Sequence, residues 1–394
     1  MKLPILPVYV YLFLFFLSSC EPWTLEKRPD HDFVTFVTTI EDNADKEAWG
    51  ILYDNSGYVV VGTSEETGSG NPDVYLVKVN EEGVKQWHSS FGDSDPEQGT
   101  ALIRRSDGQG YAIAGNKNAG GSNWQIYLVN TDLQGNKLWE QRYGWTQEDK
   151  AYSLIQQQEG GFLLLGHSLT WESANLGTEA VIYKTLANGD EQTRYNFGNP
   201  VENGQGLNDF GHSIIGTNDG HYLMVNTFED KNSTGVYNLH LLKLDGSSLA
   251  TIWNKKLIVN CHPINASLVR LDDGYAVLGA LTSNKLSLVK TGLDGSSQWE
   301  RPYDNCDCEF AASVCKTQDD GFLILSSGMT LIKTDGSGLE RERTDFSGEV
   351  LGNRCILQAS DGGYVFAGVF ENGSKKQLKI VKMYPDIKNS SPEL

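Results

Sequence analysis

Residues 151–166 read AYSLIQQQEGGFLLLG, and the pattern in this stretch repeats along the chain. An apolar run, a Gly-Gly turn and a second apolar run predict two short antiparallel strands, because glycine readily adopts the positive φ that tight turns need. The phrase of glycine, aromatic residue and apolar run recurs seven times, with the aromatic residue at Tyr58, Tyr111, Phe162, Tyr222, Tyr275, Phe322 and Tyr364. Spacings of 42 to 60 residues between copies predict four-stranded β units rather than helical repeats.

Two further strands complete each unit. A third apolar run, such as residues 75–79, is followed by a turn of the type Asp294-Gly295 and a fourth strand. The fourth strand often carries a tryptophan, at Trp87, Trp139, Trp253 and Trp299. We expect these rings to form core between neighbouring units rather than to stack on a ligand. Copies three and six depart from the pattern, with Thr193 and Arg341 where the tryptophan would fall.

The two ends of the repeat region complement each other. Residues 33–40, FVTFVTTI, read as a strand that lies before the first copy, whereas the last copy has no fourth strand after residues 378–383. The sequence therefore predicts an all-β, seven-bladed β-propeller over residues 33–384, with four antiparallel strands per blade and the N-terminal strand completing the last blade. Such closure protects strand edges that open sheets leave unpaired. Residues 385–394 would form a C-terminal tail.

These repeats also resemble those of a known group of proteins. Gly-Gly-Tyr at 362–364, Leu-Val-Lys at 76–78 and Asp-x-x-Gly-x-x-x-Trp at 132–139 are similar to the repeats of bacterial extracytoplasmic β-propellers. The turn-and-tryptophan pattern also resembles that of PQQ-type and kelch-like propellers. The resemblance covers nearly the whole mature chain, but its motifs are structural, and it implies no catalytic residue.

The first residues read as a targeting signal. Lys2, an apolar stretch from Val8 to Leu17 and two serines predict a secretory signal peptide over residues 1–19. Leu17-Ser18-Ser19-Cys20 resembles the lipobox of bacterial lipoproteins, which implies that Cys20 is lipidated and that residues 20–32 are a tether. The chain would then be an outer-membrane lipoprotein of a bacterial cell envelope, held to the membrane by its lipid. An ordinary cleaved signal is the alternative.

Charge and motif content bear on the class of function. The chain has 51 acidic and 32 basic residues, a formal charge of −19, which disfavours nucleic acid as a partner. No Gly-x-Ser-x-Gly, phosphate-binding Gly-x-x-x-x-Gly-Lys or His-Glu-x-x-His motif occurs in the sequence. We therefore expect a monomeric binding or scaffold module for a protein or glycan ligand, without a cofactor or a metal. The alternative is a carbohydrate-active or other hydrolytic propeller with an acidic site at the channel mouth.

The ligand should bind on the face that carries the longer connections. Connections between second and third strands, and from each blade to the next, lie at one end of an antiparallel meander, which we call the long-loop face. The longest are predicted at 63–73, 115–125, 166–180 and 226–238. The tight glycine turns lie at the opposite end, which we call the tight-turn face.

One position of the first strands varies in an informative way. Aligned on their turns, these strands carry a small residue at Gly50, Ala101, Ser153, Ser213, Ser267, Ser313 and Cys355. The preceding residue is large, aromatic or cationic in four copies, at Trp49, Tyr152, His212 and Arg354. We expect these four to line the long-loop entrance to the channel, with Trp145 and Trp171 as outer contacts. The alternative is that each packs a blade interface.

Cysteines and recurrent acids give further predictions. Cys261, Cys306 and Cys308 fall in equivalent loops of adjacent copies, so a disulfide between these loops is expected, with a zinc site that adds His262 as the alternative. Cys315 and Cys355 should be buried thiols. Acids that precede or begin the first strands should accept backbone hydrogen bonds, and they are Asp45, Glu97, Asp149, Asp209 and Glu309. The loop at 93–97 could instead hold calcium.

Overall fold

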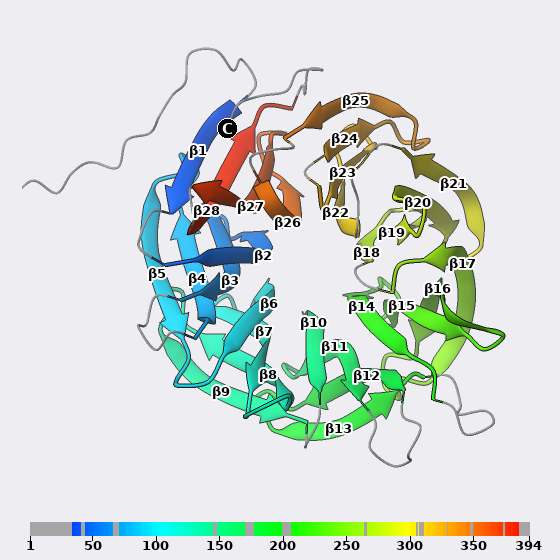
Figure 1. Cartoon of the computed structure of the whole chain (residues 1–394), viewed down its shortest axis with the longest axis horizontal. Helices are drawn as coiled ribbons and strands as arrows, with labels where there is room; N and C mark the ends of the chain where they lie inside the picture. The colour runs from blue at the N-terminus through cyan, green and yellow to red at the C-terminus, as the bar shows by residue number, and fades with distance from the viewer. Residues whose placement is uncertain are drawn as a thin grey trace, which may run out of the picture.

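The strands of the chain are arranged around a common axis (Figure 1). The computed structural model describes residues 34–40, 44–65, 71–144, 148–169, 177–198, 206–263, 266–304, 306, 311–328, 330–346, 350–372 and 375–385. Within these ranges the fold is all-β, with 28 strands and no helix. The strands form five four-stranded sheets and one eight-stranded sheet, all antiparallel, and the repeated architecture is propeller-like.

Three four-stranded sheets come first along the chain. They contain β2 (Lys46–Tyr53), β3 (Tyr58–Ser64), β4 (Asp73–Val79) and β5 (Lys85–Phe91); β6 (Glu97–Arg104), β7 (Tyr111–Asn118), β8 (Trp124–Thr131) and β9 (Lys137–Tyr143); and β10 (Asp149–Gln156), β11 (Phe162–Leu169), β12 (Thr178–Thr185) and β13 (Glu191–Asn196). In each sheet the strands follow chain order from the axis outward (Figure 1).

The eight-stranded sheet occupies the middle of the sequence. It contains β14 (Asp209–Gly216), β15 (Tyr222–Asp230), β16 (Ser233–Leu244), β17 (Thr251–Cys261), β18 (Ser267–Arg270), β19 (Gly274–Leu281), β20 (Lys285–Gly292) and β21 (Ser297–Tyr303). Its two halves, β14–β17 and β18–β21, are joined through a single residue pair, Cys261 with Leu281.

The last two sheets bring the ends of the described chain together. They contain β22 (Ala311–Lys316), β23 (Phe322–Ser326), β24 (Thr330–Thr334) and β25 (Glu340–Asp345); and β26 (Val350–Gln358), β27 (Tyr364–Asn372), β28 (Lys375–Met383) and β1 (Val34–Ile40). β1 pairs antiparallel with β28, from Val34 opposite Met383 to Ile40 opposite Leu378. The N-terminal strand therefore supplies the outer strand of the last sheet.

The innermost strands contact one another in cyclic order. β2 contacts β6, β6 contacts β10, and the series continues through β14, β18, β22 and β26 back to β2. Small residues allow this approach and also bond across it. Ser153 Oγ accepts the backbone N–H of Ile214 at 3.1 Å, and Ser267 Oγ accepts that of Val314 at 3.3 Å. The small position predicted from the sequence therefore lies where neighbouring first strands meet.

Fourth-strand tryptophans pack against the next repeat unit, as expected. Trp87 lies against Gly135 in the turn between β8 and β9, so closely that a Cβ on this glycine would come within 2.6 Å of the indole. Gly135 has φ of +77°, which strains residues with a side chain. The same arrangement joins Trp139 to Gly189, Trp253 to Gly295 and Trp299 to Gly338. Arg341 on β25 stands where the tryptophan would fall. The next sheet has no turn between its third and fourth strands, β28 and β1, because these two strands come from opposite ends of the chain.

Ion pairs explain the lysine of the repeated Leu-Val-Lys phrase. In five of the seven repeat units, a lysine on the third strand pairs with an aspartate in the turn between the first two strands. The pairs are Lys78–Asp54 at 2.6 Å, Lys243–Asp219 at 2.5 Å, Lys290–Asp273 at 2.8 Å, Lys333–Asp319 at 3.5 Å and Lys382–Asp361 at 2.7 Å. The lysine therefore fixes a tight turn within its own sheet.

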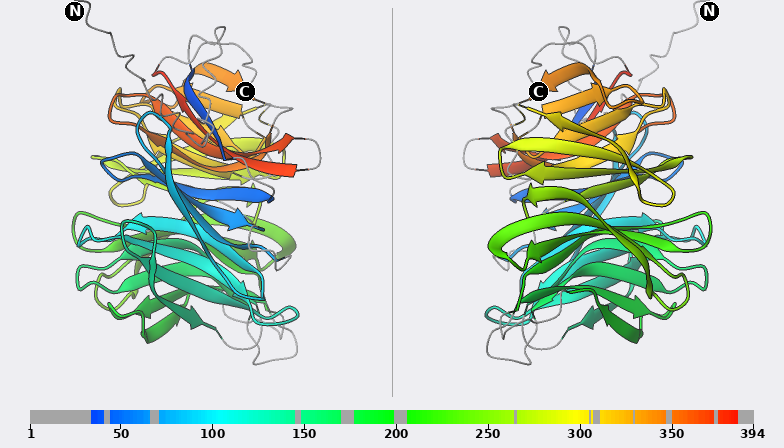
Figure 2. Two further views of the ribbon diagram at one scale, coloured as in Figure 1. Left: turned by 90° about the vertical axis from the view of Figure 1, so that its left-hand side faces the viewer. Right: turned by 90° about the vertical axis from the view of Figure 1, so that its right-hand side faces the viewer.

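The two faces of the molecule can be seen edge-on in Figure 2. Two of the predicted long connections are shorter than expected. β7 and β8 leave only residues 119–123 between them, and β15 and β16 form a hairpin across Lys231 and Asn232. The prediction of a loop at 226–238 is therefore wrong, because polar residues there continue both strands.

The described residues include no helix with the length and apolarity needed to cross a bilayer.

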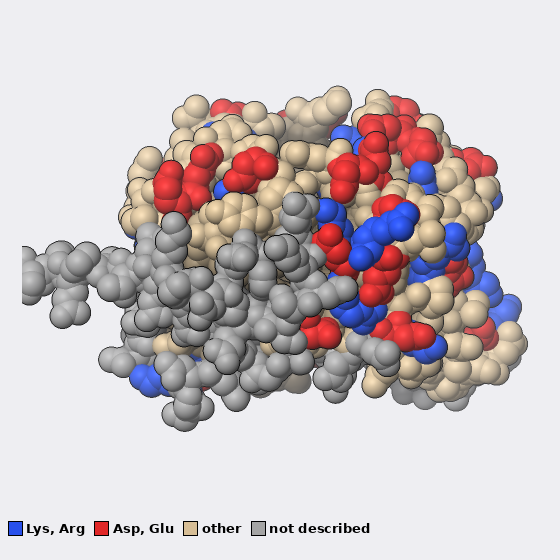
Figure 3. Space-filling view, turned by 90° about the horizontal axis from the view of Figure 1, so that it is seen from above, with Lys and Arg blue, Asp and Glu red and all other residues tan. Residues whose placement is uncertain are grey.

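The outer strands carry charges of both signs. Figure 3 shows Lys and Arg side chains interspersed with Asp and Glu over the surface seen from above. On β25, acidic and basic residues alternate from Glu340 to Arg343, and Arg343 forms a 2.7 Å ion pair with Glu340. Charged edge strands resist pairing with other chains, so the open edge of this sheet is protected from aggregation.

Candidate functional site

The varying position of the first strands is a β-bulge. The pairing register between first and second strands shifts between Ala48 and Gly50, which makes Trp49 the extra residue of a bulge in β2. Equivalent shifts lie at Thr100, Tyr152, His212, Ala312 and Arg354. A bulge bends its strand and re-aims the extra side chain. This geometry explains why the repeats keep a small residue after the bulge, whereas the residue at the bulge itself varies.

The structure brings two of the four predicted entrance residues near each other. Tyr152 on β10 lies against the ring of His167 on β11, with centroids 5.5 Å apart. His212 on the neighbouring β14 is buried, and its Nε2 lies 2.9 Å from Thr227 Oγ1. Burial lowers the pKa of His212 to about 3, so its ring is neutral at pH 7. The expectation that His212 lines an open entrance is therefore wrong, because the ring is buried against Thr227 on β15.

Of the other residues predicted to line the entrance, Trp49 has a side chain that the structure describes. Trp49 is half-buried at the bulge of β2, next to β26, which carries Arg354. The side chain of Arg354, together with Trp145 and Trp171, lies outside the part of the chain that the structure describes. For these three residues the role in binding stays a prediction.

Aromatic side chains gather on the long-loop face in a set that we call the aromatic row. It runs over three sheets and consists of Trp124, Tyr152, His167, Phe210 and Tyr237. The centroid of His167 lies 5.1 Å from that of Phe210 at an angle of 87°, and Phe210 lies 6.1 Å from Tyr237. His167 is buried, whereas the other four members are partly exposed. The row therefore presents apolar area with polar edges to solvent.

Charged groups at the same end hold the row in place. Lys150 Nζ lies 5.3 Å from the centroid of the Trp124 ring and 2.9 Å from Glu148 Oε1. Glu148 Oε1 also lies 3.4 Å from His167 Nε2. The hydrogen bond to His167 and the Lys150 charge lower the pKa of Glu148 to about 2, although partial burial opposes this. Glu148 is therefore ionised and orients both neighbours.

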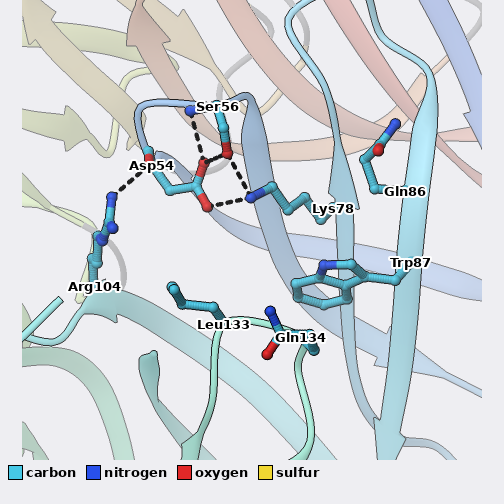
Figure 4. A pocket seen from close by; sticks show the side chains of 8 residues that line it. All are labelled: Asp54, Ser56, Lys78, Gln86, Trp87, Arg104, Leu133 and Gln134. Carbon is cyan, nitrogen blue, oxygen red and sulfur yellow. Dashed lines mark hydrogen bonds and ion pairs between the residues drawn. The ribbon is translucent and has the colours of Figure 1, made fainter. Parts of the chain in front are cut away.

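A second candidate site lies on the tight-turn face, between the first two sheets. It is a cavity of about 330 Å³, which we call the tight-turn pocket (Figure 4). Its lining residues are Asp54, Ser56, Lys78, Gln86, Trp87, Arg104, Leu133 and Gln134. They come from the turn after β2, from β4 and β5, from the end of β6 and from the turn after β8. The pocket therefore depends on the meeting of two sheets.

The acidic group of the tight-turn pocket is already satisfied. The carboxylate of Asp54 accepts hydrogen bonds from Lys78 Nζ at 2.6 Å, from Ser56 Oγ at 3.0 Å and from the hydroxyl of Tyr111. Burial alone would raise the pKa of Asp54, but the bonds from Lys78 and Tyr111 outweigh it, so the pKa lies below its usual value. Arg104 donates through Nη1 to the backbone oxygen of Asp54.

The recurrent acids have structural partners, as the sequence predicts for several of them. Asp209 Oδ1 accepts the backbone N–H of Glu229 at 3.0 Å, and Asp45 Oδ1 accepts that of Lys376 at 3.0 Å. Asp149 and Glu97 instead accept from side chains, from the hydroxyl of Tyr183 at 3.2 Å in the first case and from a lysine ammonium in the second. Glu309 lies outside the described residues. Asp149, Asp209 and Glu97 are buried, so they form no open pair of carboxylates.

Glu97 belongs to a buried cluster at the long-loop end of the first two sheets. Lys117 Nζ contacts Glu97 Oε1 and lies 2.6 Å from Asp93 Oδ2. Asp73 is fully buried, and neither of its carboxylate oxygens has a hydrogen-bond partner among the described residues. Burial, together with the charges of Asp93 and Asp73, raises the pKa of Glu97 to about 7. Among the described residues, no group of three or more His, Cys, Asp or Glu side chains is placed to hold a metal ion.

The expected disulfide is not formed at Cys261. This residue carries a free thiol in the structure, and its Sγ donates to the backbone oxygen of Tyr237 at 3.4 Å. Cys306 is buried in a neighbouring loop, and its Sγ lies 3.3 Å from the backbone oxygen of Tyr303. Cys261 ends β17, is buried and pairs with Tyr237 across the sheet. Cys20 and Cys308 lie outside the described residues.

Reasoning from the sequence missed the tight-turn pocket and most of the aromatic row. The sequence predicts Trp87 as core, and its contacts with Gly135 and Tyr111 agree with that prediction. The distinguishing signal was Arg104, a cation at the end of a first strand where the next unit has Gln156. His167 and Phe210 could have been found as aromatic residues beside the varying position.

Comparisons with other proteins do not name a function. No protein-family model matches the sequence, and no curated protein matches it. Among solved structures, a similar one is a protein of unknown function from Bacteroides caccae, which is 11% identical to this chain. The match covers 67% of this chain and 83% of that protein, with a TM-score of 0.41.

Proposed function

We propose that this protein is a membrane-anchored extracytoplasmic binding module that holds a protein partner on its long-loop face. The observation that carries the proposal is the aromatic row, which places partly exposed aromatic rings side by side across two neighbouring sheets. Aromatic residues with polar edges are enriched in the buried centres of protein interfaces. Rings that are tilted or edge-on to one another offer separate edges and grooves to a partner's side chains.

We infer further that the fold is a closed seven-bladed β-propeller. The eight-stranded sheet is joined through one residue pair, which supports counting it as two blades, β14–β17 and β18–β21. The cyclic contacts of the seven first strands support closure, and so does the pairing of β1 with β28. A closed ring of blades leaves only short, charged edges exposed and holds the aromatic row on a rigid base.

A lipid on Cys20 would set the orientation of this ring. β1 starts at Val34, which pairs with Met383, and Met383 also pairs with Tyr364 directly after a tight turn. The chain therefore enters the fold at the tight-turn face. Cys20 precedes Val34 by 14 residues, which span at most about 50 Å when fully extended. An anchor of this length keeps the tight-turn face nearer the membrane and leaves the long-loop face toward a partner.

Site-specific photo-crosslinking of the full chain in its native envelope tests the proposal. A photoreactive phenylalanine analogue at Tyr152 or Phe210 should give one discrete protein adduct, because these positions lie in the aromatic row. The matched control places the same analogue at Leu138, which is 55% exposed near a tight turn. Adducts of equal yield at Leu138, or none at either row position, would contradict the proposed binding face.

A further inference from the structure

We infer that the tight-turn pocket is a second binding site, which takes a single carboxylate-bearing sugar unit. The pocket lies at the opposite face from the aromatic row, so this site is independent of the proposed protein partner. Its volume of about 330 Å³ lies near the lower end of the range for small-molecule sites, about 300 to 1,000 Å³. One sugar ring with its substituents is therefore the size of ligand that fits.

The balance of charge in the pocket favours an anionic group. Two cations, Lys78 and Arg104, face one carboxylate, Asp54, among the lining residues. The Asp54 carboxylate already pairs with Lys78 at 2.6 Å and is ionised, so these two charges cancel each other. Arg104 then remains as the uncompensated charge. A local positive charge in a chain of formal charge −19 is a feature that the overall composition does not explain.

Arg104 retains donors that a carboxylate could use. Its only hydrogen bond among the described residues joins Nη1 to the backbone oxygen of Asp54. A guanidinium has five N–H donors in a planar fork, and the fork matches the two oxygens of a carboxylate. The bond to Asp54 fixes the side chain at the wall of the pocket, so little flexibility is lost when a ligand binds.

The other side of the pocket suits a sugar ring. Figure 4 shows Trp87 across the pocket from Arg104, with Leu133 and Gln134 between them. The indole N–H of Trp87 and the side-chain amide of Gln134 have no hydrogen-bond partner among the described residues. An aromatic wall, an apolar side chain and unpaired donors together complement the C–H groups and hydroxyls of a sugar. The pocket thus offers separate contacts to a carboxylate and to a ring.

The next sheet interface provides a matched comparison. Trp139 occupies the position of Trp87, and it packs against Gly189 and Phe162 in the same way. At the position of Arg104, however, this interface has Gln156, whose Oε1 accepts the backbone N–H of Ser106 at 2.7 Å. The interface around Trp139 therefore keeps the structural tryptophan but has no cation at the position of Arg104.

Titration of the full chain with glucuronate and with glucose tests this inference. Glucuronate should bind with a dissociation constant on the order of 1 mM, as a single sugar unit with few contacts allows. Glucose, which has the same ring without the carboxylate, should bind at least about tenfold more weakly. Acetate is the third probe and should also bind at least about tenfold more weakly, because it has the charge without the ring.

Variants identify the site. Arg104→Gln should weaken glucuronate binding about tenfold or more and leave the weak glucose binding unchanged. Trp87→Phe keeps a ring at the interface and should weaken both sugars through loss of the N–H donor. Trp139→Ala is the control and should leave glucuronate binding unchanged, with folding checked by the melting temperature. Equal affinity for glucose and glucuronate, or unchanged glucuronate binding in folded Arg104→Gln, would overturn the inference.

Discussion

The ring of Phe36 packs against the ring of Tyr58, with centroids 6.3 Å apart, although β1 belongs to the last sheet and Tyr58 to the first. Phe36 also lies against Gly83, as Trp87 lies against Gly135 one unit later. Trp87 and Tyr111 have nearly the same separation, 6.2 Å. The N-terminal strand therefore supplies the aromatic residue that other units take from a tryptophan, and it joins the first and last sheets.

Replacement of Phe36 should destabilise the whole fold. Phe36→Ala removes a buried ring from the contact between the last and first sheets, and we expect a loss of about 3 to 5 kcal/mol in the free energy of unfolding. Thr35→Ala on the same strand is the control, because Thr35 is only half-buried. Chemical denaturation of both variants measures the effect. Equal stability of Phe36→Ala and the wild type would mean that β1 does not hold the first and last sheets together.

The buried Glu97 should make the protein less stable as pH rises toward neutrality. Its pKa in the folded state is about 7, above the ordinary 4.5, so the folded chain keeps a proton that the unfolded chain loses. The stabilisation is complete below pH 4.5 and is lost as the pH rises to about 7, by on the order of 2 kcal/mol.

Glu97→Gln tests this origin of the pH dependence. The variant keeps the shape of the side chain but cannot ionise, so the decrease in stability between pH 4.5 and 7 should become smaller. Glu82→Gln, in an exposed turn, serves as the control and should retain the wild-type profile. Melting temperatures across this pH range provide the comparison. A wild-type profile in Glu97→Gln would show that another group is responsible.

His212 should have the opposite effect on the acidic side. Burial lowers its pKa to about 3 from 6.5, so the unfolded chain binds a proton that the folded chain excludes. Its contribution to stability is present above pH 6.5 and is lost as the pH falls toward 3. His212→Gln keeps a polar group near Thr227 and should reduce this loss, whereas His221→Gln, at a turn, should not. An NMR titration that gives His212 an ordinary pKa would refute the buried placement.

Cys261 should be a free but unreactive thiol. Burial raises its pKa to about 12, which leaves almost no thiolate at pH 7. Iodoacetamide should therefore fail to modify Cys261 in the native protein and should modify it after denaturation without reductant, as read by peptide mass spectrometry. If modification after denaturation required a reductant, Cys261 would be in a disulfide, as the sequence first suggested.

The repeat pattern predicts sheets well but does not predict where neighbouring sheets meet. Spacing alone identified the strand at 33–40 as the partner of the last unit, because strand edges must be paired. The bulge at Tyr152 and His212 could not be predicted, since one extra residue changes the direction of a side chain without changing the strand pattern. The tight-turn pocket likewise depends on Trp87 and Arg104, which come from two sheets and come together only in the folded chain.

The most direct test of the proposed function is the affinity of the partner that is crosslinked at Tyr152 or Phe210. Once that protein is purified, its dissociation constant for the full chain should rise at least about tenfold in Phe210→Ala, as expected for an aromatic anchor at the centre of an interface. Leu138→Ala on the tight-turn face should leave the affinity unchanged. An unchanged affinity in folded Phe210→Ala, or a loss confined to Leu138→Ala, would contradict binding through the long-loop face.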